Sequence, residues 1–189
     1  MQDDELIDLI ASSGCKGLII GFESISKESL LVCNKKCNIG KDYIKIIKKL
    51  HNKGILINGT FVFGLDTDYP DVFEKTTDFI IKSKIDLPQY TIYTPIPGTK
   101  SFERLKKEGR ILSENWDLYN GQNVVFKPKN MTPEELLQGT NLVRRKTFSM
   151  LSILKRLNDK PYLSKPYSLV SNICFKHFLN KIEPLSKAT

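Results

Sequence analysis

Hydrophobic and polar positions in the first hundred residues follow two alternating patterns. Stretches with apolar residues three or four positions apart predict helices, and short continuous apolar runs between them predict strands that are covered on both faces. The predicted strands are residues 17–23, 55–63 and 89–93. The predicted helices are centred on residues 6–10, 41–53, 70–80 and 99–108. Helices that alternate with apolar strands indicate an α/β fold with a parallel sheet.

The last third of the chain follows a different pattern. Residues 113–130 show no clear periodicity. Thr132, Pro133 and Glu135 then form a helix start, because threonine can cap, proline suits the first turn and glutamate can reach back to the cap amide. We expect that helix to run to about Leu157. The chain therefore divides into three predicted parts, residues 1–112, 113–157 and 158–189.

Length and composition limit the classes of protein. With 189 residues, of which 40% are hydrophobic, the chain is long enough for one domain with a core. It holds no run of about 18 apolar residues, which a membrane span needs, and its acidic start lacks the order of a secretion signal. We therefore expect a cytoplasmic location. The irregularly spaced cysteines are then expected to be reduced thiols, at Cys15, Cys33, Cys37 and Cys174.

The net charge of +8 arises from the C-terminal end of the chain. Residues 1–141 hold 19 basic and 19 acidic side chains, whereas the last 48 residues hold 10 basic and 2 acidic ones. A loosely attached basic helix is expected around residues 170–182, and the run Arg144-Arg145-Lys146 is expected on the solvated face of a helix. The tail lacks the interleaved aromatic residues and glycines of an RNA platform, which argues against nucleic-acid binding.

Glycines and polar residues follow each of the three predicted strands. The strand ends read Gly21-Phe22-Glu23-Ser24, Gly64-Leu65-Asp66-Thr67-Asp68 and Tyr93-Thr94-Pro95-Ile96-Pro97-Gly98-Thr99. In a parallel sheet these ends share the edge at which ligands bind. Glycines there let a ligand approach the backbone, and a carboxylate can bind a ribose diol or an ammonium group. The edge therefore suits a nucleoside-like or amino-acid-like cofactor.

Each of these residues also has a structural interpretation. A carboxylate such as Glu23 at a strand end can be solvated or salt-bridged. Asp68 can cap the helix that is entered at Pro70. Pro95 and Pro97 can form a rigid turn. The residues alone leave both interpretations open.

At the three strand ends the sequence resembles the radical S-adenosylmethionine (SAM) enzymes. Residues 17–24 are similar to the fourth-strand motif of that family, and residues 59–64 and 93–99 are similar to its fifth- and sixth-strand motifs. Residues 116–121 and 127–136 are similar to the members that carry a cobalamin-binding domain upstream. The order and spacing of the three strand motifs carry the resemblance.

The resemblance implies a fold: the C-terminal half of a partial TIM-like (βα) radical SAM barrel, followed by a helical C-terminal extension. Residues 1–112 would then be the barrel part, 113–157 a family-specific extension with a long helix, and 158–189 a basic tail. It also implies that Glu23 contacts the ribose or methionine part of SAM and that adenine lies against the sixth strand. The implied cofactor-binding residues are Gly21, Glu23, Ser24, Gly64, Tyr93, Thr94 and Pro95.

The CxxxCxxC loop that binds the [4Fe-4S] cluster of this family does not occur in the sequence. Cys33 and Cys37 have the spacing of its first two cysteines, but Gly40 stands where the third would fall, so no metal ligand and no catalytic residue is expected here. The resemblance implies a truncated portion of an enzyme that cleaves SAM reductively to a 5′-deoxyadenosyl radical. Its partner would be an upstream half with the cluster loop and, where cobalamin is used, the cobalamin site. The isolated chain is expected to be inactive.

Two other functions stay open. A non-catalytic binding module could use its basic C-terminal tail to hold RNA or an acidic partner. Salt would then weaken the binding of the chain to that partner. A different radical SAM subgroup, such as one that modifies tRNA or porphyrins, would share the strand motifs. The residues do not identify the small-molecule substrate.

Overall fold

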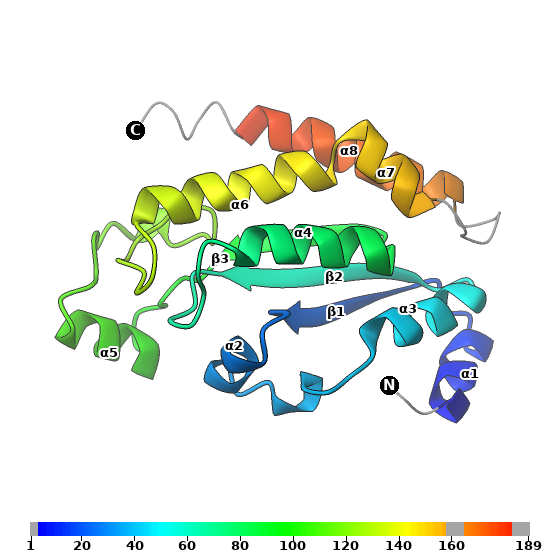
Figure 1. Ribbon diagram of the computed structural model, residues 1–189, viewed down its shortest axis with the longest axis horizontal. Helices are drawn as coiled ribbons and strands as arrows, with labels where there is room; N and C mark the ends of the chain where they lie inside the picture. The colour runs from blue at the N-terminus through cyan, green and yellow to red at the C-terminus, as the bar shows by residue number, and fades with distance from the viewer. Residues whose placement is uncertain (1–3, 158–164, 183–189) are drawn as a thin grey trace.

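Three parallel strands form the centre of the molecule. The computed structural model describes residues 4–157 and 165–182. Its strands are β1 (Gly17–Glu23), β2 (Leu56–Phe63) and β3 (Leu87–Ile92), and they lie in the order β1-β2-β3 (Figure 1). Each strand overlaps the corresponding predicted one, so the parallel α/β fold expected from the sequence is confirmed.

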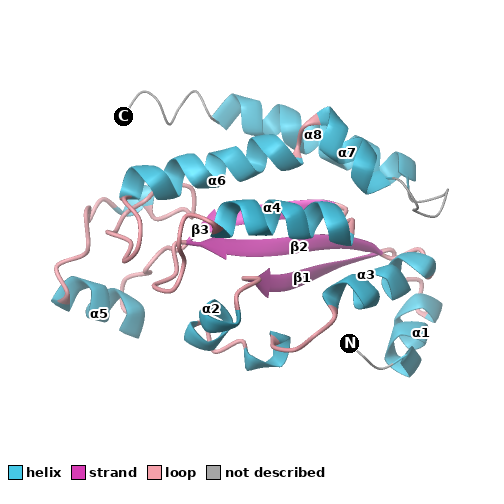
Figure 2. Ribbon diagram, in the orientation of Figure 1, coloured by secondary structure: helices cyan, strands magenta, loops and turns pink. Residues whose placement is uncertain are grey.

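Helices connect the strands and pack against the sheet (Figure 2). The expectation that both faces are covered is wrong for β1, because Ile19 on this strand is 75% exposed. The N-terminal two thirds of the chain contain α1 (Asp4–Ser12), α2 (Lys27–Val32), the 3-10 turn η1 (Lys36–Asn38), α3 (Tyr43–Asn52), α4 (Val72–Ser83) and α5 (Lys100–Lys107). The remainder contains the 3-10 turn η2 (Trp116–Leu118), α6 (Pro133–Thr147), α7 (Met150–Leu157) and α8 (Lys165–Ile182). Thr132 caps α6 with the predicted capping box, in which Glu135 accepts from the Thr132 backbone amide.

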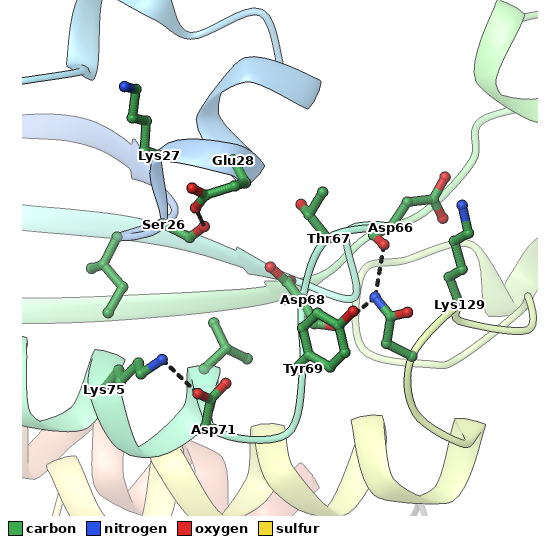
Figure 3. Close-up of a pocket in the computed structure, with 13 residues that line it drawn as sticks. Ser26, Lys27, Glu28, Asp66, Thr67, Asp68, Tyr69, Asp71, Lys75 and Lys129 are labelled. Carbon is green, nitrogen blue, oxygen red and sulfur yellow. Dashed lines mark hydrogen bonds and ion pairs between the residues drawn. The ribbon is translucent and has the colours of Figure 1, made fainter.

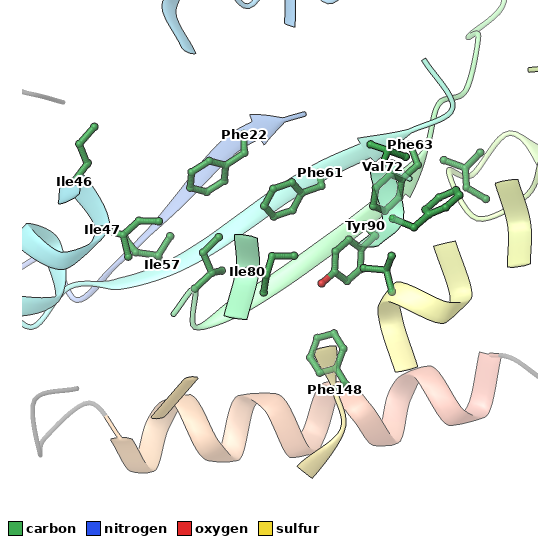
Figure 4. Close-up of a cluster of buried hydrophobic side chains, with 14 of the residues drawn as sticks. Phe22, Ile46, Ile47, Ile57, Phe61, Phe63, Val72, Ile80, Tyr90 and Phe148 are labelled. Atoms are coloured by element: carbon green, nitrogen blue, oxygen red, sulfur yellow. The ribbon is translucent and has the colours of Figure 1, made fainter. Parts of the chain in front are cut away.

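One face of the sheet carries the hydrophobic core. Along β2, buried side chains alternate with half-buried ones, because successive side chains of a strand point to opposite faces. Phe22, Phe61 and Tyr90 come from the three strands and follow one another across the covered face (Figure 4). The rings of Phe22 and Phe61 stack with their centroids 5.3 Å apart. The opposite face of β2 carries Asn58 and Thr60, so it is the more polar of the two.

The outer edge of β3 is covered by the C-terminal extension. The amide of Ile92 donates to the carbonyl oxygen of Gly121 at 2.8 Å. A guanidinium nitrogen of Arg144 donates to the carbonyl oxygen of Tyr90 at 3.1 Å. Arg144 is only 7% exposed, so its expected place on a solvated helix face is wrong; Arg145 and Lys146 are exposed as expected. A strand edge needs donors for its carbonyls, and Arg144 supplies one.

The helix expected to run from Thr132 to about Leu157 is two helices. α6 ends at Thr147, and Ser149 starts α7 by accepting a hydrogen bond from the amide of Ser152. The break leaves the carbonyl of Thr147 free to accept from Arg156 at 2.8 Å. The helix therefore breaks where the buried Arg156 needs an acceptor.

The basic C-terminal segment includes α8, which is hydrogen-bonded to the rest of the molecule. Asn172 is 1% exposed. Its amide nitrogen donates to the carbonyl of Asp86, just before β3, and its oxygen accepts from Arg156 at 2.7 Å. The three-part division of the chain stays a prediction, but these bonds attach α8 to the sheet. None of the helices in residues 4–157 and 165–182 is long and apolar enough to cross a membrane.

The contact between α4 and α6 depends on Gly139. A Cβ at this position would lie 2.2 Å from the ring of Phe73 on α4. We expect Gly139→Ala to lower the free energy of unfolding by about 1–3 kcal/mol, because the ring has to move out of a packed core. At an unobstructed helical position the same change would stabilise by about 1 kcal/mol. Urea denaturation measures the difference, with the exposed neighbour Gln138→Ala as control; a stabilised Gly139→Ala variant would contradict the packing.

Candidate functional site

The carboxyl ends of the three strands meet around one cavity. Its volume is about 380 Å³. Glu23 ends β1, Val62 belongs to β2 and Tyr93 follows β3, and all three line the cavity. The other walls come from the α2–α3 connection, the β2–α4 loop and α5, namely Val32, Cys33, Lys35, Leu65, Asp66, Ser101 and Arg104. The three strand ends therefore meet at one edge of the sheet, as predicted from the sequence, and this edge encloses a cavity.

Glu23 is held in an unusual backbone conformation at this cavity. Its φ is 61°, in the left-handed region that non-glycine residues rarely adopt. The strand pairing shifts between Gly21 and Glu23, which is a β-bulge. Bulges re-aim side chains next to functional sites, and strained backbone is retained where the surroundings enforce it. The conformation therefore marks Glu23 as a candidate functional residue.

Gly21 makes room for the Glu23 carboxylate. A Cβ at Gly21 would lie 2.6 Å from Glu23 Oε1, so any side chain at position 21 would displace that oxygen. The amide nitrogen of Asn38 donates to the carbonyl oxygens of Gly21 at 3.0 Å and Phe22 at 3.3 Å. These bonds fasten the α2–α3 connection to the bulge. The carboxylate thus lies folded back over the strand, in a place that glycine keeps open.

Lys35 is the cationic partner of Glu23. Its Nζ lies 3.1 Å from Glu23 Oε1, and the carboxylate side chain is 20% exposed. The hydrogen bond and the charge of Glu23 raise the pKa of Lys35. The cavity therefore presents a carboxylate and an ammonium side by side, which is an arrangement that can bind a molecule carrying both charges.

The other predicted cofactor residues occupy different places. Tyr93 lines the cavity, and its ring packs edge-on against Phe126 with the centroids 5.5 Å apart. Ser24 is buried and accepts a hydrogen bond from the amide of Ser26. Thr94 donates its hydroxyl to the carbonyl of Ile92 and Pro95 is buried; neither lines the cavity.

Gly64 faces the extension and not the cavity. Its φ is 96°, and a Cβ there would lie 2.7 Å from a methyl carbon of Leu136 and 3.3 Å from the ring of Phe126. The glycine is thus needed for close packing of the helical extension on the end of β2. Its amide donates to Asp68 Oδ2 at 3.0 Å.

Asp68 organises the loop after β2. It is 2% exposed and accepts from the amides of Gly64 and Leu65 and from the hydroxyl of Ser29. Burial raises the pKa of Asp68, although these three hydrogen bonds act in the opposite direction. The expected cap of the following helix is wrong, because Asp71 occupies the N-cap position of α4. Asp68 instead joins the second strand end to α2.

Sequence reasoning missed the basic residues around Asp66. Arg104 from α5 and Arg110 each donate to one carboxylate oxygen of Asp66 at 2.7 Å. Burial would raise the pKa of Asp66, but the hydrogen bonds and charges of the two arginines outweigh it and lower the pKa. Neither arginine, nor Lys35, stands at a strand end or in a motif, so no local signal marks them.

The two cysteines with cluster-like spacing differ in their surroundings. Cys33 lines the cavity and Cys37 is exposed. Burial, followed by the charges of Glu23 and Asp68, raises the pKa of the Cys33 thiol and so favours its protonated form. Among residues 4–157 and 165–182, no group of three histidine, cysteine or acidic residues could hold a metal ion.

A second cavity of about 730 Å³ lies on the other side of Asp66, between α2 and the start of α4 (Figure 3). Its polar side chains are largely bonded to one another: Lys75 pairs with Asp71, and Ser26 donates to Glu28. The amide nitrogen of Asn130 donates to the carbonyls of Asp66 and Asp68. The extension thereby holds the loop that separates the two cavities.

Comparison with curated proteins finds methyltransferases and a cyclase. Over 184 residues the chain is 33% identical to bacteriochlorophyllide d C-12(1)-methyltransferase of Chlorobaculum tepidum, a match that covers 97% of this chain and 39% of that protein. It is 29% identical to bacteriochlorophyllide d C-8(2)-methyltransferase of the same organism, over 95% of this chain and 40% of the relative. It is 28% identical to anaerobic magnesium-protoporphyrin IX monomethyl ester cyclase of Cereibacter sphaeroides, over 73% of this chain and 22% of the relative.

The chain thus spans about two fifths of the length of its two bacteriochlorophyllide methyltransferase relatives. Both matches extend over nearly the whole chain, so they include the helical extension as well as the strands. No family model matches the chain.

The left-handed conformation of Glu23 gives a stability test. Glycine adopts this conformation without the steric cost that a Cβ imposes. We therefore expect Glu23→Gly to unfold with a free energy about 1 kcal/mol higher than Glu23→Ala, since both variants lose the ion pair with Lys35 and only alanine keeps the strain.

Urea denaturation of the two variants measures this difference. Glu28 in helix α2 is the control, because there the alanine variant should be the more stable by about 1 kcal/mol. Equal stabilities of Glu23→Gly and Glu23→Ala would show that position 23 is not strained.

Proposed function

Because the chain belongs to the cobalamin-associated branch of the radical SAM proteins, we propose that it forms one wall of a SAM-binding site. The carboxylate of Glu23 carries the proposal. It stands at the carboxyl edge of a parallel sheet, folded over Gly21 and directed into a cavity that the three strand ends share. A carboxylate in that place can bind the ammonium group or the ribose hydroxyls of SAM.

The residues around Glu23 fit the remainder of this cofactor. Lys35, 3.1 Å from the carboxylate, offers a cation to the methionyl carboxylate of SAM. Tyr93, which follows β3 and lines the cavity, lies where an adenine ring would contact the chain. A ligand that carries both an ammonium and a carboxylate would exchange the internal Glu23–Lys35 pair for two new ion pairs. The exchange costs little, because an ion pair this exposed contributes only about 0–1 kcal/mol.

Gly21, Ser24, Gly64, Thr94 and Pro95 support the site in our proposal. Gly21 keeps the place of the carboxylate open, and the other four fix the loops that follow the strands. No described residue of this chain is assigned a chemical step. The residues bind and orient the cofactor and shield it from water.

The inorganic part of the reaction lies outside the described residues in this proposal. When bound, a [4Fe-4S] cluster supplies the electron that cleaves SAM to a 5′-deoxyadenosyl radical, and the cysteines that hold it belong to an upstream part of a longer protein. Cobalamin, where it is used, binds in that upstream part as well. We propose that the chain alone is inactive for this reason.

Carbon methylation of a tetrapyrrole is the reaction that the relatives favour. Three relatives match at least 95% of this chain. Two are bacteriochlorophyllide methyltransferases, at 33% and 29% identity, and the third is an anaerobic magnesium-protoporphyrin IX monomethyl ester cyclase of Rubrivivax gelatinosus, at 24% identity. A tRNA-2-methylthio-N(6)-dimethylallyladenosine synthase of Buchnera aphidicola matches 67% of the chain. All three of the relatives with the longer matches act on large ring substrates, and the identity is higher to the two methyltransferases than to the cyclase. We therefore propose a methyl transfer to a large ring substrate within a complete enzyme, and not a modification of tRNA.

Titration with SAM tests the cofactor site directly. We expect SAM to shift the backbone amide resonances of residues 21–24 and of Lys35 in nuclear magnetic resonance spectra of the chain. Glu23→Gln should weaken binding about tenfold, because a hydrogen bond to a charged group contributes about 1.5–3 kcal/mol. Glu103→Gln on the exposed surface of α5 is the matched control and should bind like the unchanged chain. Equal affinities of the two variants would refute the role of Glu23.

Reconstitution tests the proposed place of the cluster. Anaerobic incubation of the chain with iron and sulfide is expected to leave it colourless, since no described group of residues could hold a metal ion. Absorption spectroscopy and iron analysis measure the outcome. A stoichiometric cluster with reductive cleavage of SAM by the chain alone would overturn this part of the proposal.

A further inference from the structure

Helices α7 and α8 have an inverted distribution of polar and apolar side chains. On α7, Ser152 and Arg156 are buried, while Leu151 is 65% exposed and Leu154 is 56% exposed. A helix at a protein surface normally buries its apolar stripe and exposes its polar one. Here Ile153 is the one buried apolar side chain of α7, while two leucines face outwards although the same helix buries a serine and an arginine.

The same inversion continues on α8. Ser168 and Asn172 are buried on the side that meets the sheet. The exposed apolar residues are three, three and five positions apart, which places them on one side of the helix. They are Tyr167, Val170, Ile173 and Phe178. The buried side of α8 is thus selected for hydrogen bonds to Arg156 and Asp86, and the exposed side for apolar contact.

Lysines border the apolar side chains. A shallow groove of about 420 Å³ between the two helices is lined by Leu151, Leu154 and Leu157 together with Lys155 and Lys165. The last 48 residues of the sequence hold 10 basic and 2 acidic side chains, and of the basic ones Arg144 and Arg156 are buried. The surface therefore combines apolar groups with positive charge, and it requires an occupant that is both apolar and anionic.

We infer that the exposed face of α7 and α8 docks on an anionic lipid surface. Leucine, valine and phenylalanine side chains insert between acyl chains, and lysines beside them attract anionic headgroups. A second copy of the chain is the less suitable occupant, because two such faces would bring like charges together. RNA is less suitable as well, since phosphates would use the lysines and leave the aliphatic side chains in water.

The position of the face is compatible with this assignment. α7 packs against α4 and α8, and α8 packs against β3, while an upstream strand would pair at the edge of β1, the other outer strand of the sheet (Figure 1). The start of α8 also reaches the start of β1, where Tyr167 and Gly17 line one cavity. Strands added at β1 would extend the sheet away from α7. The inference does not depend on the proposed SAM site.

Sedimentation with vesicles tests the inference. The full chain is mixed with vesicles of phosphatidylcholine alone or of phosphatidylcholine with phosphatidylglycerol. We expect the chain to pellet with the anionic vesicles and to be released by salt. Lys155→Ala should weaken vesicle binding about fivefold, and Leu151→Ser with Leu154→Ser should weaken it at least about tenfold.

The control replaces an equally exposed leucine elsewhere. Leu31 on α2 is 47% exposed and lies far from α7, so Leu31→Ser should leave vesicle binding unchanged. Circular dichroism of each variant verifies that it is folded. The serine substitutions remove exposed side chains only, so they should not unfold the chain.

Three outcomes would overturn the inference. The first is a folded chain that stays in the supernatant with anionic vesicles at low salt. The second is binding that the Leu151 and Leu154 substitutions and Leu31→Ser reduce equally. The third is a dimer in solution that the Leu151 and Leu154 substitutions dissociate, because the face would then be an interface between copies.

Discussion

Hydrogen bonds from buried arginines to main-chain carbonyls hold the C-terminal helices against the sheet. Arg144 donates to the carbonyl of Tyr90 within β3, and Arg156 donates to the carbonyls of Ile85 and Asp86 just before that strand. A buried guanidinium is costly unless its donors are paired. The two terminal nitrogens of Arg156 are paired in this way, whereas its Nε is buried without a hydrogen-bond partner. These hydrogen bonds cover the outer edge of β3 and hold the helices α6, α7 and α8 in place. The carboxyl ends of the strands are then the part of the sheet that a ligand can reach.

Much of the fold could be predicted because it rests on local patterns. The strand at Gly17–Glu23, the capping box at Thr132 and the alternation of helix and strand are all written in neighbouring residues. The family assignment is confirmed by the methyltransferase relatives. The burial of Arg144 could not be predicted, because it depends on the carbonyl of Tyr90, which is more than fifty residues away in the sequence. The break after Thr147 could not be predicted either, because the Thr147 carbonyl can accept from Arg156 only once the helix has ended.

The candidate site divides in the same way. Glu23 and Tyr93 could be placed at one edge, because parallel strands bring their carboxyl ends together. Lys35 and Arg104 could not be placed there, because Lys35 reaches the cavity from the α2–α3 connection and Arg104 from α5. No short sequence pattern specifies the direction of either element. The resemblance to the family implies that Gly64 lies at the cofactor, and in the structure a side chain at this position would meet Leu136 and Phe126. A glycine motif alone cannot distinguish the approach of a ligand from the approach of a helix.

The cavity and the contact of α7 with the sheet lie at opposite ends of β3. Arg156 joins α7 to the carbonyls of Ile85 and Asp86, before the strand begins, whereas Tyr93 enters the cavity after the strand ends. Strands rise about 3.3 Å per residue, so β3 separates the two regions by roughly 20 Å. At that distance substitutions in the two regions act independently unless a shared element changes its state. A lipid surface against α7 and α8 would therefore orient the rim of the cavity without altering its contacts.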